Sequence, residues 1–233
     1  MDNWFQRTLD EEYQLVRVLK RSDDGDVFQL RHKELGRDII RINHTGSADV
    51  YNLLKRYSHK NIARIYEVHT SGSSVTVLEE YIDGMTVGEV LQTGLYTENG
   101  VRKIAAQLCD ALEFVHSIGI VHRDIKPENI IITSDGTVKL IDWNAARIHK
   151  KYISSDTTTM GTTGYAAPEQ YGITQSDSRA DIYSVGILMN VMLTGDHPSK
   201  KMCTGSLAKV IKKCTDIQPD RRYQTAAELR KQI

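Results

Sequence analysis

The chain has 233 residues, of which 40% are hydrophobic, and its 30 basic and 30 acidic side chains leave a formal net charge of zero. This length suits one domain with two lobes, and the balanced charge gives no reason to expect nucleic acid or an anionic membrane as a partner. The few, scattered cysteines exclude a disulfide framework, and because there is no signal peptide and no long apolar run, we expect a cytoplasmic protein without membrane contact.

The first third of the chain carries strand patterns separated by turn residues. An alternating run precedes the turn residues Asp23, Asp24 and Gly25 and an apolar run follows them, which is typical of a β-hairpin. A helix is expected to begin near Ser47, a good N-cap residue. The expected strands span residues 13–19, 27–30, 39–42, 62–68 and 74–78, and the helix spans residues 47–57.

The remainder of the chain is mainly helical in pattern. A short helix is expected at residues 87–91, followed by a long amphipathic helix with its apolar residues on one face. Gly119 is suited to end the long helix, because glycine readily adopts the left-handed conformation after the last turn. The long helix spans residues 98–118, and later helices span residues 181–193, 206–214 and 225–232.

Residues 122–129 read His-Arg-Asp-Ile-Lys-Pro-Glu-Asn and lie between two short apolar runs. Pro127 fixes φ and lacks a backbone donor, so this segment is expected to be a polar loop between small buried strands. Asp124 offers a carboxylate for a hydroxyl proton and Lys126 an ammonium for phosphate charge. Asn129 adds an amide for a metal ion, and together these groups suit phosphoryl transfer.

Two further motifs follow the loop. Residues 142–144 read Asp-Trp-Asn after an apolar strand, and residues 161–169 read Gly-Thr-Thr-Gly-Tyr-Ala-Ala-Pro-Glu. In order and spacing the three segments resemble the H-R-D-L-x-x-x-N, D-F-G and A-P-E motifs of protein kinases. The resemblance covers nearly the whole chain and implies one kinase domain, residues 1–233, with an α+β fold. Residues 1–82 would form a small N-lobe, an antiparallel sheet with one helix, and residues 83–233 a mainly helical C-lobe.

The resemblance assigns chemistry to four side chains. Asp124 is expected to act as the catalytic base or to orient the substrate hydroxyl. Lys126 is expected to steady the transferred phosphoryl group, a choice typical of serine/threonine kinases. Asn129 and Asp142 are expected to bind Mg²⁺, with ATP as the phosphoryl donor. The implied partner is a protein with a serine or threonine acceptor.

The resemblance also assigns regulatory residues. Arg123 precedes the catalytic aspartate, as in kinases whose activation loop responds to phosphorylation. Thr158 is the expected phosphosite, with the threonines at 157 and 159 as alternatives. Thr162 is expected to hydrogen-bond near the catalytic aspartate and to favour serine/threonine substrates.

Other motif residues have expected structural roles. Asp181 should cap the backbone of the catalytic loop, and Glu169 should pair with Arg222. Trp143 stands where the family has phenylalanine and is expected to fill an apolar slot. Asn144 replaces the motif glycine, and asparagine tolerates positive φ better than most residues do.

The nucleotide-binding elements of the N-lobe depart from the family pattern. Aligned on Val27, the glycine positions of the phosphate-covering loop hold Lys20, Ser22 and Gly25, so only one glycine remains. The family's strand lysine is absent. Arg41 is the best match for it, and Ile42 is the alternative if the preceding turn is one residue longer.

The ion pair that this lysine makes with a helix glutamate lacks both members. The glutamate position holds Val50, and the adjacent Asp49 would face about 100° away around the helix. Glu79 falls at the position that gates the pocket behind the adenine. A buried carboxylate there needs a partner, for which Arg41 is the candidate, and the alternative is that Glu79 faces solvent.

Backbone groups at residues 80–82 are expected to meet the adenine edge, and with Arg41 in register Ile39 would lie above the adenine. The full set of expected ATP contacts is Ser22, Gly25, Val27, Ile39, Arg41, Glu80, Tyr81, Ile82 and Ile131.

Three functions are compatible with these motifs. The complete catalytic loop favours an active serine/threonine protein kinase with weakened ATP anchoring. The loss of the family's nucleotide-binding residues in the N-lobe favours a pseudokinase that binds nucleotide or acts as a signalling scaffold. A small-molecule phosphotransferase is disfavoured, because those enzymes lack the peptide platform that residues 161–169 resemble.

Overall fold

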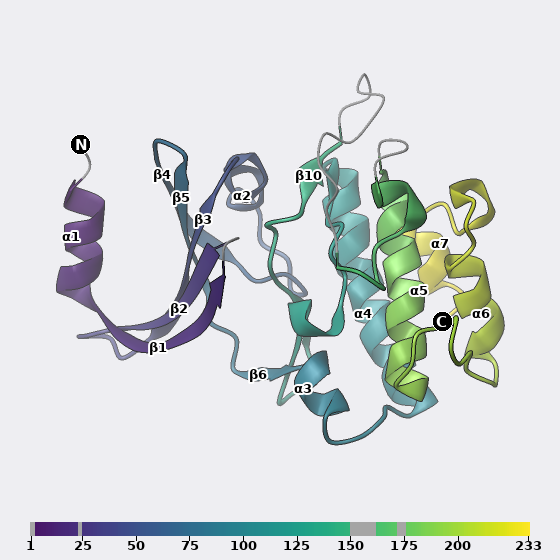
Figure 1. Ribbon diagram of the computed structural model, residues 1–233. Coiled ribbons are helices and arrows are strands. Elements are labelled where there is room, and N and C mark those ends of the chain that lie inside the picture. The colour runs from purple at the N-terminus through teal and green to yellow at the C-terminus, as the bar shows by residue number, and fades with distance from the viewer. Residues whose placement is uncertain (1–2, 23–24, 150–161, 172–175) are drawn as a thin grey trace. The chain divides into compact units, whose positions relative to one another are not determined.

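A computed structural model of the chain describes residues 3–22, 25–149, 162–171 and 176–233 (Figure 1). The chain divides into two compact units. Unit 1 contains Met1–His59 and Ala63–Ile82, and unit 2 contains Lys60–Ile62 and Asp83–Ile233. The first unit is a sheet with helices and the second is mainly helical, so the α+β class expected from the sequence is confirmed.

Unit 1 is built on a five-stranded antiparallel sheet with the strand order β1-β2-β3-β5-β4. The strands are β1 (Tyr13–Ser22), β2 (Gly25–His32), β3 (Asp38–Thr45), β4 (Ile65–Ser71) and β5 (Ser74–Glu80). Every strand expected in this region is present. β4 begins three residues later than predicted, at Ile65. Ile62 belongs to unit 2, where it forms an isolated bridge with Leu140.

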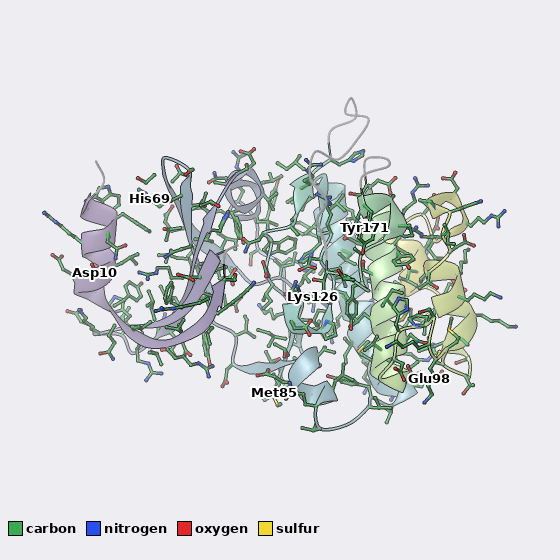
Figure 2. The ribbon with its side chains drawn as sticks, viewed as in Figure 1. Asp10, His69, Met85, Glu98, Lys126 and Tyr171 are labelled. Carbon is green, nitrogen blue, oxygen red and sulfur yellow. The ribbon has the colours of Figure 1, made fainter. Side chains whose placement is uncertain are left out.

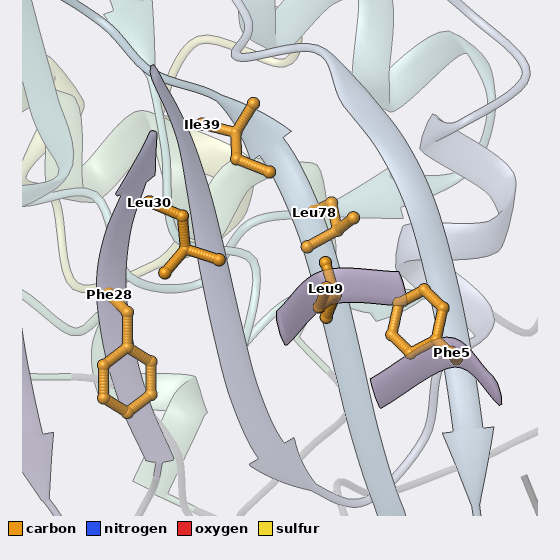
Figure 3. Packing of buried hydrophobic residues seen from close by; sticks show 6 residues of the cluster. All are labelled: Phe5, Leu9, Phe28, Leu30, Ile39 and Leu78. Carbon is orange, nitrogen blue, oxygen red and sulfur yellow. The ribbon is translucent and has the colours of Figure 1, made fainter. Parts of the chain in front are cut away.

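Helices cover the two faces of this sheet (Figure 1). Helix α1 (Asn3–Glu12) packs Phe5 and Leu9 against one face, shown in Figure 3. Helix α2 (Asp49–Leu54) lies on the other face, where the rings of Tyr51 and His44 approach to 5.4 Å between centroids. We call these the α1 face and the α2 face. Alternation along the strands places Phe28, Leu30, Ile39, Arg41 and Leu78 on the α1 face.

The helices of unit 1 differ from the sequence prediction in two ways. Helix α1 was not predicted, although Phe5 and Leu9 lie one helical turn apart. Helix α2 is shorter than expected, and Ala48 occupies its N-cap position. The Ser47 hydroxyl instead accepts a hydrogen bond from the backbone N–H of Asp49 at 3.1 Å, which stabilises a turn before the helix.

Unit 2 is mainly helical, and its described residues also contain five short strands, which form two small sheets. Strands β6, β8 and β9 form an antiparallel sheet, and β10 pairs with β7. The helices are α3 (Val87–Leu91), α4 (Glu98–Ser117), α5 (Ser178–Thr194), α6 (Leu207–Cys214) and α7 (Ala226–Arg230). The strands are β6 (Gly84–Thr86), β7 (Ile120–Val121), β8 (Ile130–Thr133), β9 (Val138–Leu140) and β10 (Arg147–Ile148), and the 3-10 helices are η1 (Pro127–Asn129), η2 (Pro168–Tyr171) and η3 (Pro219–Arg221).

Glycines shape the core of unit 2 at two points. Gly119 has a φ of 81° and follows the end of α4, as predicted from the sequence. Gly186 lies inside the buried helix α5, where a Cβ atom would come within 2.5 Å of Cys214 Cβ on α6. The absence of a side chain at Gly186 therefore allows α5 and α6 to pack closely. None of the helices in the described ranges combines the length and the apolarity that crossing a membrane requires.

Candidate active site

The backbone of the loop between β7 and β8 is hydrogen-bonded to Asp181 of α5. Its carboxylate accepts hydrogen bonds from the backbone N–H groups of His122, at 2.9 Å, and of Arg123, at 2.7 Å. Arg123 has a φ of 69°, a conformation that costs energy for a residue with a side chain. The buried carboxylate of Asp181 stabilises this strained turn, so the loop contact expected from the sequence is present.

Asp181 also contacts a residue that the sequence analysis missed. His116, at the end of α4, lies with Nε2 2.8 Å from Asp181 Oδ2. Burial alone would raise the pKa of Asp181, but hydrogen bonds and nearby histidine rings outweigh burial and lower it. A polar residue near the buried face of an amphipathic helix was the available signal for His116.

Asp124 is the centre of a hydrogen-bonded cluster. Its Oδ1 accepts from the Thr162 hydroxyl at 2.6 Å and from the Thr162 N–H at 3.1 Å. Its Oδ2 lies 2.7 Å from Lys126 Nζ and accepts from Asn129 Nδ2 at 3.0 Å. Burial alone would raise the pKa of Asp124, but the hydrogen bonds from Lys126 and Thr162 outweigh burial and lower it. The carboxylate is therefore held in its charged, proton-accepting form.

Lys126 connects this carboxylate to Thr162. Its ammonium donates a hydrogen bond to the Thr162 hydroxyl at 2.8 Å and also contacts the Asp124 carboxylate (Figure 2). A cation, a carboxylate and a hydroxyl thus meet within hydrogen-bond distance. This arrangement can orient an incoming hydroxyl group and balance phosphate charge at the same place.

Asn129 and Asp142 are brought together by the pairing of β8 with β9. The N–H of Ile141 donates to the carbonyl of Asn129 at 3.0 Å, so Asp142 follows directly after this contact. Asn129 uses Nδ2 toward Asp124, which leaves its amide oxygen as the atom suited to a cation. In the described residues no cluster of three His, Cys, Asp or Glu groups could hold a metal ion. One carboxylate and one amide oxygen, completed by phosphates and water, nevertheless fit the coordination that Mg²⁺ takes.

The Asp-Trp-Asn segment differs from expectation in one respect. Trp143 is 1% exposed, and its ring centroid lies 4.7 Å from that of His122, so the side chain is buried, as predicted. The positive φ was expected at Asn144, but the structure places it at Asp142, with a φ of 63°. Asp142 Oδ1 accepts the N–H of Asn144 at 3.3 Å, and aspartate tolerates this conformation for the same reason as asparagine does.

The segment after residue 161 is anchored by a buried ion pair. Arg222 donates to both carboxylate oxygens of Glu169, at 2.6 and 2.9 Å, which is the pairing expected from the sequence. Gln170, which the sequence analysis did not single out, donates to the carbonyl of Arg123 at 2.8 Å. The expected phosphosite Thr158 and its neighbours at 157 and 159 lie outside the described residues.

Unit 1 places the predicted ATP contacts on different faces of its sheet. Arg41 pairs with Phe28 and with Leu78, so its side chain lies on the α1 face, and its guanidinium lies 4.5 Å from the Phe28 ring centroid. Burial there lowers the pKa of Arg41, although Asp10 and Asp26 oppose the effect. Ile39 lies on the same α1 face, within the cluster of Figure 3.

The α2 face carries the other residues of β3. Ile40 and Ile42 alternate with Arg41, and both are buried. Glu79 pairs with Ile40, so it also lies on the α2 face, where it is 4% exposed. The expected Arg41–Glu79 ion pair is therefore excluded by the register, and so is the alternative in which Glu79 faces solvent.

The hairpin glycine has a structural explanation. Gly25 has a φ of 141°, and a Cβ atom there would come within 2.3 Å of the carbonyl oxygen of Asn43. Ser22 pairs with Gly25 across the hairpin and donates its hydroxyl to the Gly25 carbonyl at 3.0 Å. The close approach of β3 therefore explains why residue 25 is a glycine, and no bound phosphate is needed to explain it.

The remaining predicted contacts lie at the ends of strands. The N–H of Glu80 donates to the carbonyl of Arg64 at 2.8 Å, so this donor is already used within unit 1. Tyr81 and Ile82 follow β5 directly, and Ile131 lies half-buried in β8 of unit 2. Val27 lies on the α2 face opposite Ile42.

Comparison with known proteins agrees with this arrangement. The family described as "Protein kinase domain" matches residues 20–233. This chain belongs to the protein kinase family. It is 30% identical over 264 residues to the serine/threonine-protein kinase PknB of Mycolicibacterium smegmatis, covering 95% of this chain and 42% of that protein. It is 29% identical to PknB of Mycobacterium tuberculosis, again over 95% of this chain and 42% of that protein. A probable serine/threonine-protein kinase of Clostridium acetobutylicum is 32% identical over 199 residues, covering 75% of this chain and 30% of that protein.

Family membership changes the interpretation of β3. In protein kinases the β3 lysine pairs with a glutamate on the following helix, so it must lie on the face that this helix covers. Of the two candidates for the lysine position, Ile42 lies on the α2 face and Arg41 does not, so the register supports the alternative, Ile42, in place of Arg41 and of Ile39 above the adenine. The glutamate position holds Val50, which is buried, while Asp49 is exposed. With this assignment, both positions expected from the sequence to carry the family's ion pair hold apolar residues.

Proposed function

We propose that this chain is a serine/threonine protein kinase domain that transfers the γ-phosphoryl group of ATP to a protein hydroxyl. The observation that carries the proposal is the cluster around Asp124. Its carboxylate accepts hydrogen bonds from Thr162 and Asn129 and contacts the Lys126 ammonium. A non-catalytic fold does not require these groups to converge. The printed names of the relatives describe serine/threonine kinases, which supports the same substrate class.

The chemistry follows from the positions of these groups. The Asp124 carboxylate would orient the acceptor hydroxyl and accept its proton, displacing the Thr162 hydroxyl that it now binds. The Lys126 ammonium, 2.7 Å from that carboxylate, would stabilise negative charge on the phosphoryl oxygens as the bond to the acceptor forms. The low pKa of Asp124 keeps the carboxylate ionised at neutral pH.

Asn129 and Asp142 are the residues proposed to bind Mg²⁺. The Asn129 amide oxygen and the Asp142 carboxylate are hard oxygen donors, and the β8–β9 pairing holds their backbones next to each other. When bound, Mg²⁺ in protein kinases neutralises charge on the ATP phosphates. The hydrogen bond from Asn129 to Asp124 would connect the metal ligands to the proton acceptor.

The test is phosphoryl transfer from ATP to a protein substrate or to the chain itself. Asp124→Asn keeps the size of the side chain but removes the charge, and we expect it to lower turnover by at least about 100-fold. Glu113→Gln is the matched control, because Glu113 is an exposed carboxylate on α4 that does not belong to the loop, and its turnover should match that of the unmodified protein. Equal turnover in both variants would disprove the assignment of Asp124.

A pseudokinase is the second candidate, and one observation favours it. Ile42 and Val50 are apolar at the two positions proposed for the family's ion pair, so β3 offers no lysine or arginine on the α2 face. MgATP binding without phosphoryl transfer, unchanged by Asp124→Asn, would support this reading over an enzyme.

A further inference from the structure

The α2 face of unit 1 contains a cation that does not come from β3. In the sheet register Lys20 of β1 pairs with Val27 of β2, and Val27 pairs with Ile42 of β3. Directly paired residues on neighbouring strands point to the same face. Lys20, Val27 and Ile42 therefore form one row across the α2 face.

A β-bulge sets this direction for Lys20. The register shifts between Val18 and Lys20, so that Leu19 is an extra residue opposite the β2 strand. Val18 pairs with Phe28 on the α1 face, and the bulge then lets Lys20 pair with Val27 on the α2 face. Bulges commonly re-aim a side chain in this way.

The position suits a replacement for the missing β3 lysine. Neighbouring strands lie about 4.8 Å apart, so the Cα of Lys20 is roughly 10 Å from that of Ile42 across the intervening strand. The flexible four-carbon stem of lysine can extend over Val27 toward the space in front of Ile42. Lys20 is exposed, and within the described residues it forms no ion pair that would hold it elsewhere.

The neighbouring basic residues are less suited to this task. Arg17 lies on the same face, but its Nε donates to Gln29 Oε1 at 2.8 Å, and Gln29 in turn donates to Asp38. Arg41 is on the opposite face, over the Phe28 ring. Arg21 pairs with Asp26, which neighbours Val27 and so faces the α1 side.

We propose that Lys20 supplies the positive charge that binds the triphosphate of ATP in this protein, in place of the β3 lysine. The assignment rests on the proposed function, because it concerns the nucleotide of that reaction. It makes Lys20 a residue that binds phosphate from the hairpin, at a position where the family has a glycine. With Lys20 in this role, phosphate binding does not require a lysine at residue 42 or a glutamate at residue 50.

The test measures binding of MgATP, MgADP and adenosine by calorimetry to the unmodified protein, Lys20→Met and Arg21→Met. Lys20→Met should weaken MgATP and MgADP binding by about 100-fold and leave adenosine binding within twofold, because only the phosphates contact the ammonium. Arg21→Met is the matched control from the opposite face and should bind all three ligands within twofold of the unmodified protein. Both side chains are exposed, so thermal unfolding should be unchanged.

Each result has one meaning. MgATP binding that is unaffected by Lys20→Met overturns the assignment of Lys20 and leaves the proposed function intact. Equal loss of MgATP and adenosine binding also overturns it, because that pattern indicates a structural role. If the unmodified protein does not bind MgATP, the assignment and the proposed function fail together. Selective loss of phosphate-bearing ligands supports the assignment even if the unmodified protein transfers no phosphoryl group.

Discussion

Removal of the Arg222 guanidinium should be among the most destabilising single substitutions in unit 2. Arg222 is 2% exposed and donates to both oxygens of Glu169, at 2.6 and 2.9 Å. It also donates to the carbonyls of Asp216, at 2.8 Å, and of Arg179, at 3.0 Å. Loss of one partner leaves the other charge buried and uncompensated, which costs about 3–5 kcal/mol.

Arg222→Met isolates this effect, because methionine retains much of the volume of the side chain. For a unit of this size the loss corresponds to a fall in Tm of roughly 6–20 °C. Glu169→Gln should cost less, about 1.5–3 kcal/mol, since the amide still accepts a hydrogen bond from the guanidinium. The neighbouring Arg221 is the last residue of η3 and is exposed, so Arg221→Met should stay within about 0.5 kcal/mol of the unmodified protein.

The assay is urea unfolding followed by circular dichroism for all four proteins. The reasoning would be refuted if Arg222→Met lost less than about 1 kcal/mol, or no more than Arg221→Met. Such a result would mean that solvent or another side chain neutralises Glu169 when Arg222 is removed.

Three further substitutions test the packing and the electrostatics. Gly186→Ala should destabilise the protein by about 1–3 kcal/mol in urea unfolding, because the new Cβ would come within 2.5 Å of Cys214 Cβ. The lowered pKa of Asp181 stabilises the fold above the ordinary aspartate pKa of 3.8, and this contribution is lost as the pH falls through the folded-state pKa. Asp181→Asn should therefore lower Tm at pH 7 and flatten its decline in acid, and a curve parallel to that of the unmodified protein would contradict this. Arg41→Met should leave MgATP binding within twofold, because Arg41 lies over the Phe28 ring on the α1 face, and a large loss of binding would contradict the register argument.

The sequence alone was sufficient to predict that three side chains of the candidate active site lie close together, because they are close together along the chain. Asp124, Lys126 and Asn129 lie within one loop, and Pro127 prevents that loop from continuing as a helix. Local patterns likewise predicted the strands of unit 1 and the main helices of unit 2. A one-turn spacing of two apolar residues was too weak a signal for α1, which is stabilised by packing on the sheet.

Only the tertiary structure decided which side chains of β3 meet α2. Side chains alternate along a strand, so a difference of one residue in the turn before β3 exchanges every residue between the two faces. Arg41 and Ile42 were both compatible with the sequence, and the pairing of β3 with β2 and β5 selects Ile42 for the α2 face. The same dependence on register places Lys20 on that face, through a bulge that no local pattern in the sequence reveals.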